Sequence, residues 1–321
     1  MYDEGVAGLE EVDIIEQGIA DMSIDLLKIL LIDKTTKKYI RWATDNYASL
    51  GKDYSAGVEI KPEFITGNYT NVIQPRVAKS QTEQMKRTRD KAEVFTPCWI
   101  CNEQNNLVDD AWFGRQNVFN TSSGDSWRVT DGVVDFPNDK TWQQYVDARR
   151  LEISCGEAPY LVSRYNTVTG ESIQIKDRIG ILDRKMRIVS ENTQTEEEWL
   201  KWTIRAFQST YGYDYQGDNV LLARENLLFT FSDYMVSKFG KEPTLVQMKK
   251  IANIVAWNIW QMDGITLTTP YSEASPLHRQ MTIFDYMDGN VEEEKIPMFS
   301  LIRDWRAEET IEFRSLMNEG Y

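Results

Sequence analysis

The sequence predicts an α/β protein with a mainly parallel sheet, preceded by a small α+β unit. Short apolar runs alternate with long amphipathic segments from about residue 100 onward. Alternation of this kind is typical of parallel sheets, because a parallel connection has to cross back over the sheet. A basic stretch near residue 90 separates the two parts. We therefore expect an N-terminal α+β domain with a basic linker over residues 1–90, and a larger domain over residues 91–321.

Composition excludes several classes of protein. Of the 321 residues, 41% are hydrophobic and 27% are charged, which is far too apolar for a disordered chain. Fifty acidic and 36 basic residues give a net charge of −14, so a DNA-binding surface would have to be a local basic patch. Three cysteines, no signal-peptide pattern and no apolar run of roughly 20 residues predict a cytoplasmic protein without a membrane span or a disulfide framework.

The N-terminal part is expected to begin with an acidic helix over residues 10–19. Apolar runs at 26–32 and 39–43 flank the polar segment 33–38, which predicts a hairpin. Residues 76–91 then form the most basic stretch of the chain. It is either a solvated linker helix or a strip that faces DNA phosphates, and in the second case the DNA-binding candidates are Lys79, Lys86, Arg87 and Arg89.

The larger domain is expected to contain four helices and at least one strand. A helix over 100–113 precedes a strand over 149–153. The next helix, 196–209, starts at Thr195 with a capping box to Glu198. A helix over 219–239 ends at Gly240, and a further helix covers 245–257.

The segment after the first of these strands carries the most informative motif. Leu151-Glu152-Ile153-Ser154-Cys155-Gly156 is a short strand followed at once by a turn of small residues, which allows a ligand to approach the backbone closely. It resembles the first motif of class I S-adenosylmethionine-dependent methyltransferases that act on adenine in DNA, the modification subunits of restriction-modification systems. That resemblance implies a Rossmann-like methyltransferase domain. It also implies that the methionine part of the cofactor is lined by Glu152, Ser154, Cys155, Gly156 and Tyr160.

Three more segments resemble the family's motifs in the expected order. Upstream, Phe95, Thr96 and Pro97 match the Thr-Pro motif that touches the cofactor. Downstream, Asp214 matches the acid that binds the ribose hydroxyls, and Asp263 the acid that binds the adenine amino group. The resemblance covers residues 93–264. The first and second acids lie further apart than one helix requires, which implies an insertion around residues 167–198.

The family's catalytic tetrapeptide, Asn or Asp followed by Pro-Pro and an aromatic residue, is missing. The nearest candidates are Tyr271, in Thr268-Thr269-Pro270-Tyr271, and Asn290. Two functions therefore remain open. One is methyl transfer to DNA adenine in a restriction-modification or phage-related setting, with or without a partner subunit that supplies specificity or catalysis. The other is a degenerate methyltransferase fold that acts as a non-enzymatic binding, partner or anti-defence protein.

Weaker patterns point elsewhere. Asp53, Glu59 and Lys61 resemble a fragment of a metal-dependent nuclease site. Cys98 and Cys101 have the spacing of half a zinc site, but the chain lacks a second pair, and buried cysteines on a helix explain them better. We expect no metal site.

Overall fold

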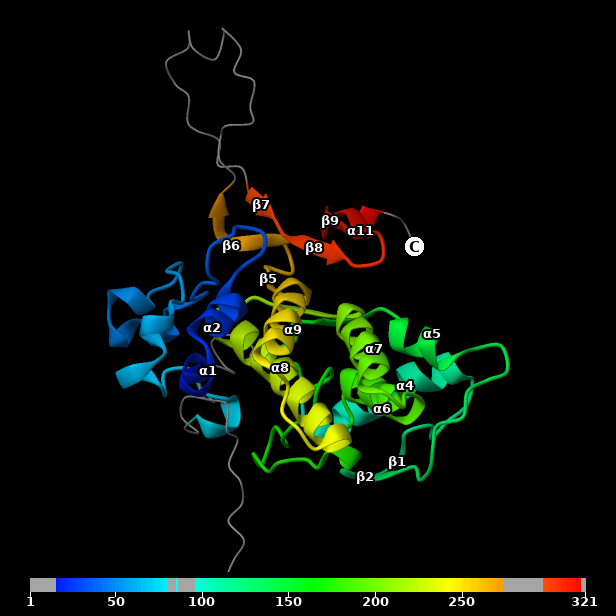
Figure 1. The fold of residues 1–321 in the computed structure, drawn as a ribbon. Coiled ribbons are helices and arrows are strands. Elements are labelled where there is room, and N and C mark those ends of the chain that lie inside the picture. The colour runs from blue at the N-terminus through cyan, green and yellow to red at the C-terminus, as the bar shows by residue number, and fades with distance from the viewer. Residues whose placement is uncertain (1–15, 80–84, 86–95, 274–296, 319–321) are drawn as a thin grey trace, which may run out of the picture.

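The computed structural model describes residues 16–79, 85, 96–273 and 297–318. It is a mixed α/β structure in which helices surround one three-stranded parallel sheet, with three two-stranded antiparallel sheets beside it (Figure 1). Within the described residues, no helix combines the length and the apolar character needed to cross a membrane.

The parallel sheet consists of β3 (Arg150–Ile153), β4 (Thr210–Asp214) and β5 (Ile259–Gln261), adjacent in that order. Ile153 pairs with Tyr213, and Asp214 pairs with Gln261, so the carboxyl ends of all three strands lie at one edge. Helices α6 (Ile181–Asn192) and α7 (Glu196–Gln208) connect β3 to β4, while α8 (Gly217–Phe239) and α9 (Leu245–Asn258) connect β4 to β5. The predicted strand over 149–153 is therefore confirmed.

The predicted helices of the larger domain are confirmed as well, and their ends follow from their capping residues. Helix α4 covers Cys98–Phe113. At α7 the Thr195 hydroxyl accepts a hydrogen bond from the Glu198 amide. The complete, reciprocal capping box occurs instead at α5 (Trp142–Asp147) and at α9. Helix α8 ends where Gly240 adopts a left-handed φ of 66°.

The N-terminal part differs from its prediction. Helix α1 covers Glu16–Met22, and the first residues of the predicted acidic helix lie outside the described residues. The predicted hairpin is wrong in its first arm, because α2 (Ile24–Leu31) is a helix. Leu26, Leu27, Leu30 and Leu31 are all buried, and this spacing places them on one helical face, a pattern that we had interpreted as a continuous strand. The turn itself is present, closed by the Ile32–Tyr39 bridge.

After this turn the N-terminal part consists of short 3-10 helices rather than strands. These are η1 (Asp45–Leu50), η2 (Lys52–Tyr54), η3 (Pro62–Phe64), η4 (Gly67–Tyr69) and η5 (Arg76–Ala78).

The N-terminal part and the larger domain share one hydrophobic core, which contains buried residues of α2, α8 and α9. Arg224 on α8 is fully buried and donates hydrogen bonds to backbone carbonyls of four residues, Leu30, Ile32, Ala256 and Ile259. Gln261 on β5 exchanges two hydrogen bonds with the backbone of Arg41. The predicted boundary near residue 90 lies outside the described residues.

The segment 167–198, predicted to be an insertion, contributes to the core. It contains η6 (Ile175–Asp177) and α6, on which Asp183, Arg184 and Lys185 are each about 1% exposed. The Lys185 ammonium donates to Ala148, Ser209 and Thr210, and burial lowers its pKa well below the usual value.

The remaining strands form three antiparallel pairs. Strands β1 (Asn120–Ser123) and β2 (Ser126–Val129) form a hairpin. Strand β6 (Thr268–Glu273) pairs with β7 (Pro297–Phe299), and β8 (Leu301–Asp304) pairs with β9 (Glu309–Glu312), ahead of α11 (Ser315–Asn318). Strands β6 to β9 gather at one end of the molecule (Figure 1). There Ile302 and Phe313 pack on Tyr211, Tyr213 and Trp260 of the parallel sheet.

Candidate functional site

The turn that follows β3 contains three residues with a left-handed backbone. Ser154, Gly156 and Ala158 have φ values of 49°, 54° and 64°. Ala158 adopts the conformation that glycine favours, although it carries a Cβ. The turn is closed by a hydrogen bond of 2.7 Å from the Ala158 amide to the Cys155 carbonyl. Such a backbone is held by its surroundings at some cost in free energy, which is common at ligand-binding turns.

This turn contacts the carboxyl end of β4 directly. The Gly156 amide donates to Asp214 Oδ2 at 2.9 Å, and the Gln216 amide donates to Asp214 Oδ1 at 2.8 Å. Asp214 is buried, and burial raises its pKa to about 6 although the two amides favour the ionised form. Asp214 is thus an ionised acceptor at neutral pH. One amide from the turn after β3 and one from the residue before α8 hold its carboxylate in place.

Two buried acceptor atoms beside this contact have no hydrogen-bond partner among the described residues. Glu152 Oε1 accepts from the Tyr160 amide at 3.4 Å, but its Oε2 accepts no hydrogen bond. The amide nitrogen of Asn219, on the first turn of α8, lies 3.5 Å from Asp214 Oδ1, and Asn219 Oδ1 is also without a partner. Burial raises the pKa of Glu152 well above its usual value. Unpaired buried acceptors are costly, and a ligand that donates hydrogen bonds satisfies them.

The predicted Thr-Pro motif lies against the same turn. The side chain of Thr96 lies close enough to the Tyr160 hydroxyl to affect its pKa, which burial raises. The backbone carbonyl of Thr96 accepts from the Thr167 hydroxyl at 3.1 Å, and Pro97 caps the start of α4. Phe95 lies outside the described residues. Segments far apart in the sequence therefore meet at Tyr160.

Asp263 lies just beyond the third strand and forms a turn of its own. Its Oδ1 accepts from the amides of Ile265 and Thr266 at 2.8 and 3.1 Å. The neighbouring Met262 amide donates to the Asp214 carbonyl at 3.0 Å. Asp263 is partly exposed, and so is Gly156, whereas Ser154 is exposed. The three predicted acids therefore lie at or near the carboxyl ends of three adjacent strands: Glu152 is one residue before the end of β3, Asp214 ends β4, and Asp263 is two residues beyond β5.

The predicted DNA-binding and catalytic residues are placed differently. Lys79 is buried, with its ammonium 3.9 Å from Asp218 Oδ2, so its charge faces the interior. Tyr271 is half exposed, but its hydroxyl donates to the Ala43 carbonyl at 2.9 Å. Its ring lies 3.3 Å from the position that a Cβ on Gly57 would take. Lys86, Arg87, Arg89 and Asn290 lie outside the described residues.

The weaker patterns do not assemble into sites. Cys98, Cys101 and Cys155 are buried free thiols, as expected for cysteines that face a core. Glu59 accepts from the Tyr39 amide, while the Lys61 ammonium lies over the Phe64 ring at 5.7 Å. Across the described ranges, no three His, Cys, Asp or Glu side chains come together in a way that suits a metal ion.

Sequence reasoning missed two buried side chains beside the turn. One is Asn219, five residues after Asp214 at the start of a helix. The other is Glu157, whose carboxylate accepts from the Arg76 amide at 2.6 Å and from the Tyr165 hydroxyl. An acid in the middle of an otherwise small-residue turn was the available signal for Glu157. Comparison of the chain with protein-family models, with curated proteins and with solved structures found no match.

Proposed function

We propose that this chain binds S-adenosylmethionine at the carboxyl edge of β3, β4 and β5 and transfers its methyl group to adenine in DNA. The observation that carries the proposal is the order of the acids. Glu152 is the penultimate residue of β3, Asp214 is the last residue of β4, and Asp263 lies two residues after β5. The three strands are adjacent and parallel, and the left-handed turn lies between the first two acids in the sequence. Edges of this kind are where open α/β sheets bind nucleoside ligands.

The residues at this edge fit the cofactor. S-adenosylmethionine is rich in hydrogen-bond donors: an ammonium group, two ribose hydroxyls and an adenine amino group. Asn219 Oδ1 and Glu152 Oε2 have no partner among the described residues, and the positive charge of the ammonium would favour the ionised, accepting form of Glu152. Asp214 Oδ2 accepts the Gly156 amide and has a lone pair left. In this proposal Glu152 accepts from the ammonium, Asp214 and Asn219 from the ribose, and Asp263 from the adenine amino group. The bound cofactor would supply a methyl group on a positively charged sulfur, ready for transfer to a nucleophile.

The first experiment is calorimetric titration of the purified protein with S-adenosylmethionine and with its demethylated product. We expect Asp214→Ala to weaken binding by about 10- to 100-fold, because two hydrogen bonds to a charged acceptor are lost. Asp131→Ala is the matched control, since the Asp131 side chain is 95% exposed and far from the edge in sequence. Equal affinity of Asp214→Ala and the wild-type protein would remove Asp214 from the site.

The second function, cofactor binding without methyl transfer, is favoured by one observation. The Tyr271 hydroxyl is bound to Ala43 and its ring packs at Gly57, so this aromatic side chain is not free to stack on an extruded base. Tritiated methyl transfer to mixed-sequence DNA, in the preparation used for calorimetry, separates the two functions. Transfer supports the enzyme, and binding without transfer supports a protein that retains only the ligand site or acts with a partner.

A further inference from the structure

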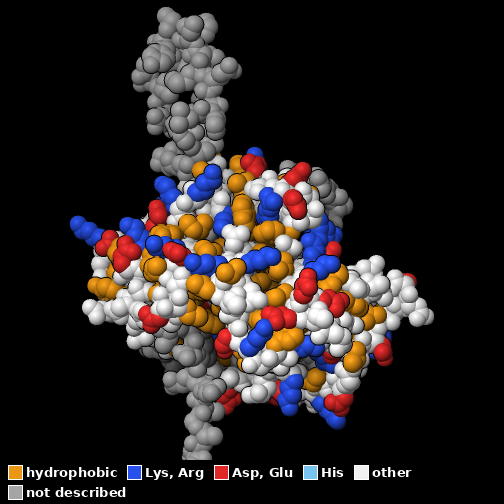
Figure 2. Space-filling model, viewed as in Figure 1, with side chains coloured by type: hydrophobic (Ala, Val, Ile, Leu, Met, Phe, Trp, Pro, Cys, Tyr) orange, Lys and Arg blue, Asp and Glu red, His pale blue; other side chains and the backbone are white. Residues whose placement is uncertain are grey.

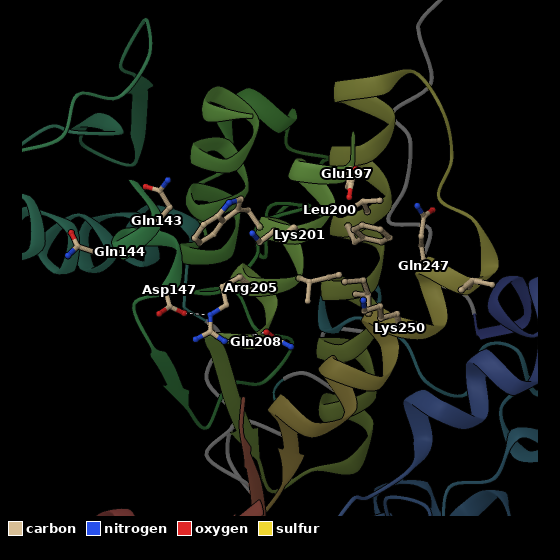
Figure 3. Close-up of a pocket in the computed structure, with 15 residues that line it drawn as sticks. Gln143, Gln144, Asp147, Glu197, Leu200, Lys201, Arg205, Gln208, Gln247 and Lys250 are labelled. Carbon is tan, nitrogen blue, oxygen red and sulfur yellow. Dashed lines mark hydrogen bonds and ion pairs between the residues drawn. The ribbon is translucent and has the colours of Figure 1, made fainter. Parts of the chain in front are cut away.

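A groove runs along the outer face of α7, with α5 on one side and α9 on the other. It encloses about 850 Å³. Figure 3 shows the labelled side chains of α7, among them Leu200 and Lys201, between those of α5 and those of α9. The groove is long and open rather than closed around a small molecule, because its floor follows the axis of a 13-residue helix.

The floor of the groove is aliphatic. Leu200 and Ile204 lie one helical turn apart on α7, and Val246 and Ile251 line the α9 side. Val246 is 78% exposed, which is unusual for a valine next to other apolar side chains. Figure 2, viewed from the same side as Figure 1, shows hydrophobic side chains reaching the surface of this face between basic and acidic ones.

Three basic and two acidic side chains line the groove, so it carries a small positive charge on a chain whose net charge is −14. Lys201 on the floor and Lys250 on the α9 side are in no ion pair with any described residue, and both line the groove. Asp147 on the α5 side is already engaged by Arg205 and by Arg306 of the C-terminal hairpin. Glu197, in the first turn of α7, is the remaining acid of the lining. An occupant that carries acidic groups is therefore attracted here.

We propose that this groove binds an amphipathic helix of a partner protein, with apolar residues on one face and acidic residues along its flanks. A helix that follows α7 would span about 20 Å, or nearly four turns, at 1.5 Å per residue. Apolar residues at i, i+3, i+4 and i+7 would fill the aliphatic floor, in the manner of helix-in-groove recognition. Nucleic acid is a poorer occupant, because its sites combine many phosphate contacts with aromatic stacking platforms. Of the two aromatic side chains that line this groove, Phe231 is buried and Trp202 packs edge-on against Trp142, and two lysines offer few phosphate contacts.

The proposal goes beyond cofactor binding and stands independently of it. None of the residues assigned to the cofactor lines the groove. Asp147, Arg205 and Gln208 of the lining lie just before β3 and β4 begin, whereas the assigned acids lie at or near the carboxyl ends of the strands. A partner helix and a nucleoside ligand therefore do not compete for the same residues.

The test uses a fluorescein-labelled synthetic helical peptide of about 14 residues, with leucines at helical spacing and glutamates beside them, against the full-length protein. A second peptide has the same leucines and lysines in place of the glutamates. We expect the anisotropy titrations to give a Kd for the acidic peptide at least about tenfold lower than for the basic peptide. The affinity of the acidic peptide should fall as the salt concentration is raised. The double variant Lys201→Glu and Lys250→Glu should reverse this preference.

Exposed residues give variants that leave the fold intact. Val246→Asp should weaken binding of the acidic peptide at least about tenfold, because it places a charge among the apolar side chains of the groove. Ile265→Asp, at an apolar residue that is 94% exposed outside the groove, should change nothing. Failure of the acidic peptide to bind, equal binding of both peptides, or indifference to Val246→Asp would overturn the proposal. A dimer in sedimentation that Val246→Asp dissociates would overturn it as well, since the occupant is then a second copy.

Discussion

Glu16 on α1 and Glu225 on α8 are fully buried carboxyl groups whose oxygens have no hydrogen-bond partner. Burial raises the pKa of Glu16 to about 8, and burial together with the charge of Glu16 raises the pKa of Glu225 well above its usual value. Both carboxyl groups therefore hold their protons to higher pH in the folded protein than in the unfolded chain. The unfolded chain loses these protons near pH 4.5, so the folded state is favoured below that pH and loses stability as the pH rises toward 8.

We expect Glu225→Gln to remove much of this pH dependence, because a neutral amide of the same shape replaces a carboxyl group that resists ionisation. The gain in free energy of unfolding at pH 8 should be on the order of 2 kcal/mol, with little change at pH 4. Urea denaturation at both pH values measures it. Glu103→Gln, at an exposed position on α4, is the control. A wild-type protein that is equally stable at pH 5 and pH 8 would contradict the assignment.

The pKa of Asp214 predicts a different pH dependence, that of ligand binding. Its value of about 6 means that the carboxylate gains a proton as the pH falls below 6 and then offers fewer acceptor sites. Affinity for S-adenosylmethionine should be constant above pH 7 and should fall below pH 6. Calorimetry from pH 5 to pH 8 tests this expectation. In Asp214→Asn the step near pH 6 should disappear, and a step that persists belongs to another group.

At the scale of elements, the start of α8 is fixed by a glycine. A Cβ on Gly217 would lie 2.2 Å from the Arg41 carbonyl oxygen, so the N-terminal segment packs directly on the helix backbone. Gly217→Ala should force the two apart and lower the free energy of unfolding by about 3 kcal/mol. Gly18→Ala is the matched control, since nothing lies within 4 Å of its Cβ. Because Gly18 is inside α1, that change should instead stabilise the helix, by up to about 1 kcal/mol.

The elements that sequence predicts well are those with local signals. Thr195 and Gly240 mark the ends of α7 and α8, because a cap or a left-handed glycine depends only on its own neighbours. Helix α2 was missed because Leu26 to Ile32 is apolar on nearly every side, and short apolar runs do not distinguish a buried helix from a strand. The burial of α6 was missed because its Asp183, Arg184 and Lys185 have partners in distant segments.

At the scale of the whole molecule, Arg224 connects the N-terminal part to the sheet. Arg224→Met keeps the apolar stem but leaves four buried carbonyl contacts unmade, and we expect a loss of about 3 kcal/mol in the free energy of unfolding. Hydrogen exchange should then accelerate first in residues 24–43. Arg128→Met, at a side chain that is 87% exposed, should leave the exchange pattern unchanged. Uniform acceleration over the whole chain would contradict a local role for Arg224.

The candidate site also depends on this whole-molecule arrangement. Motif order brought Glu152, Asp214 and Asp263 to the carboxyl ends of three adjacent strands, because short apolar runs in the sequence show where those strands lie. It did not reveal that Lys79 faces Asp218 inside the protein, nor that Tyr271 is bound to Ala43. Both contacts join residues that are far apart in the sequence, and nothing in the local pattern records them.

The shared core also has a consequence for the chain as it is synthesised. Helix α2 leaves the ribosome more than two hundred residues before α9, the helix against which it packs. At a synthesis rate of about 5 to 20 residues per second, the leucine face of α2 remains without α9 for about ten seconds or longer. The N-terminal part therefore cannot complete its fold before α9 has been synthesised, and until then its apolar face is available to chaperones.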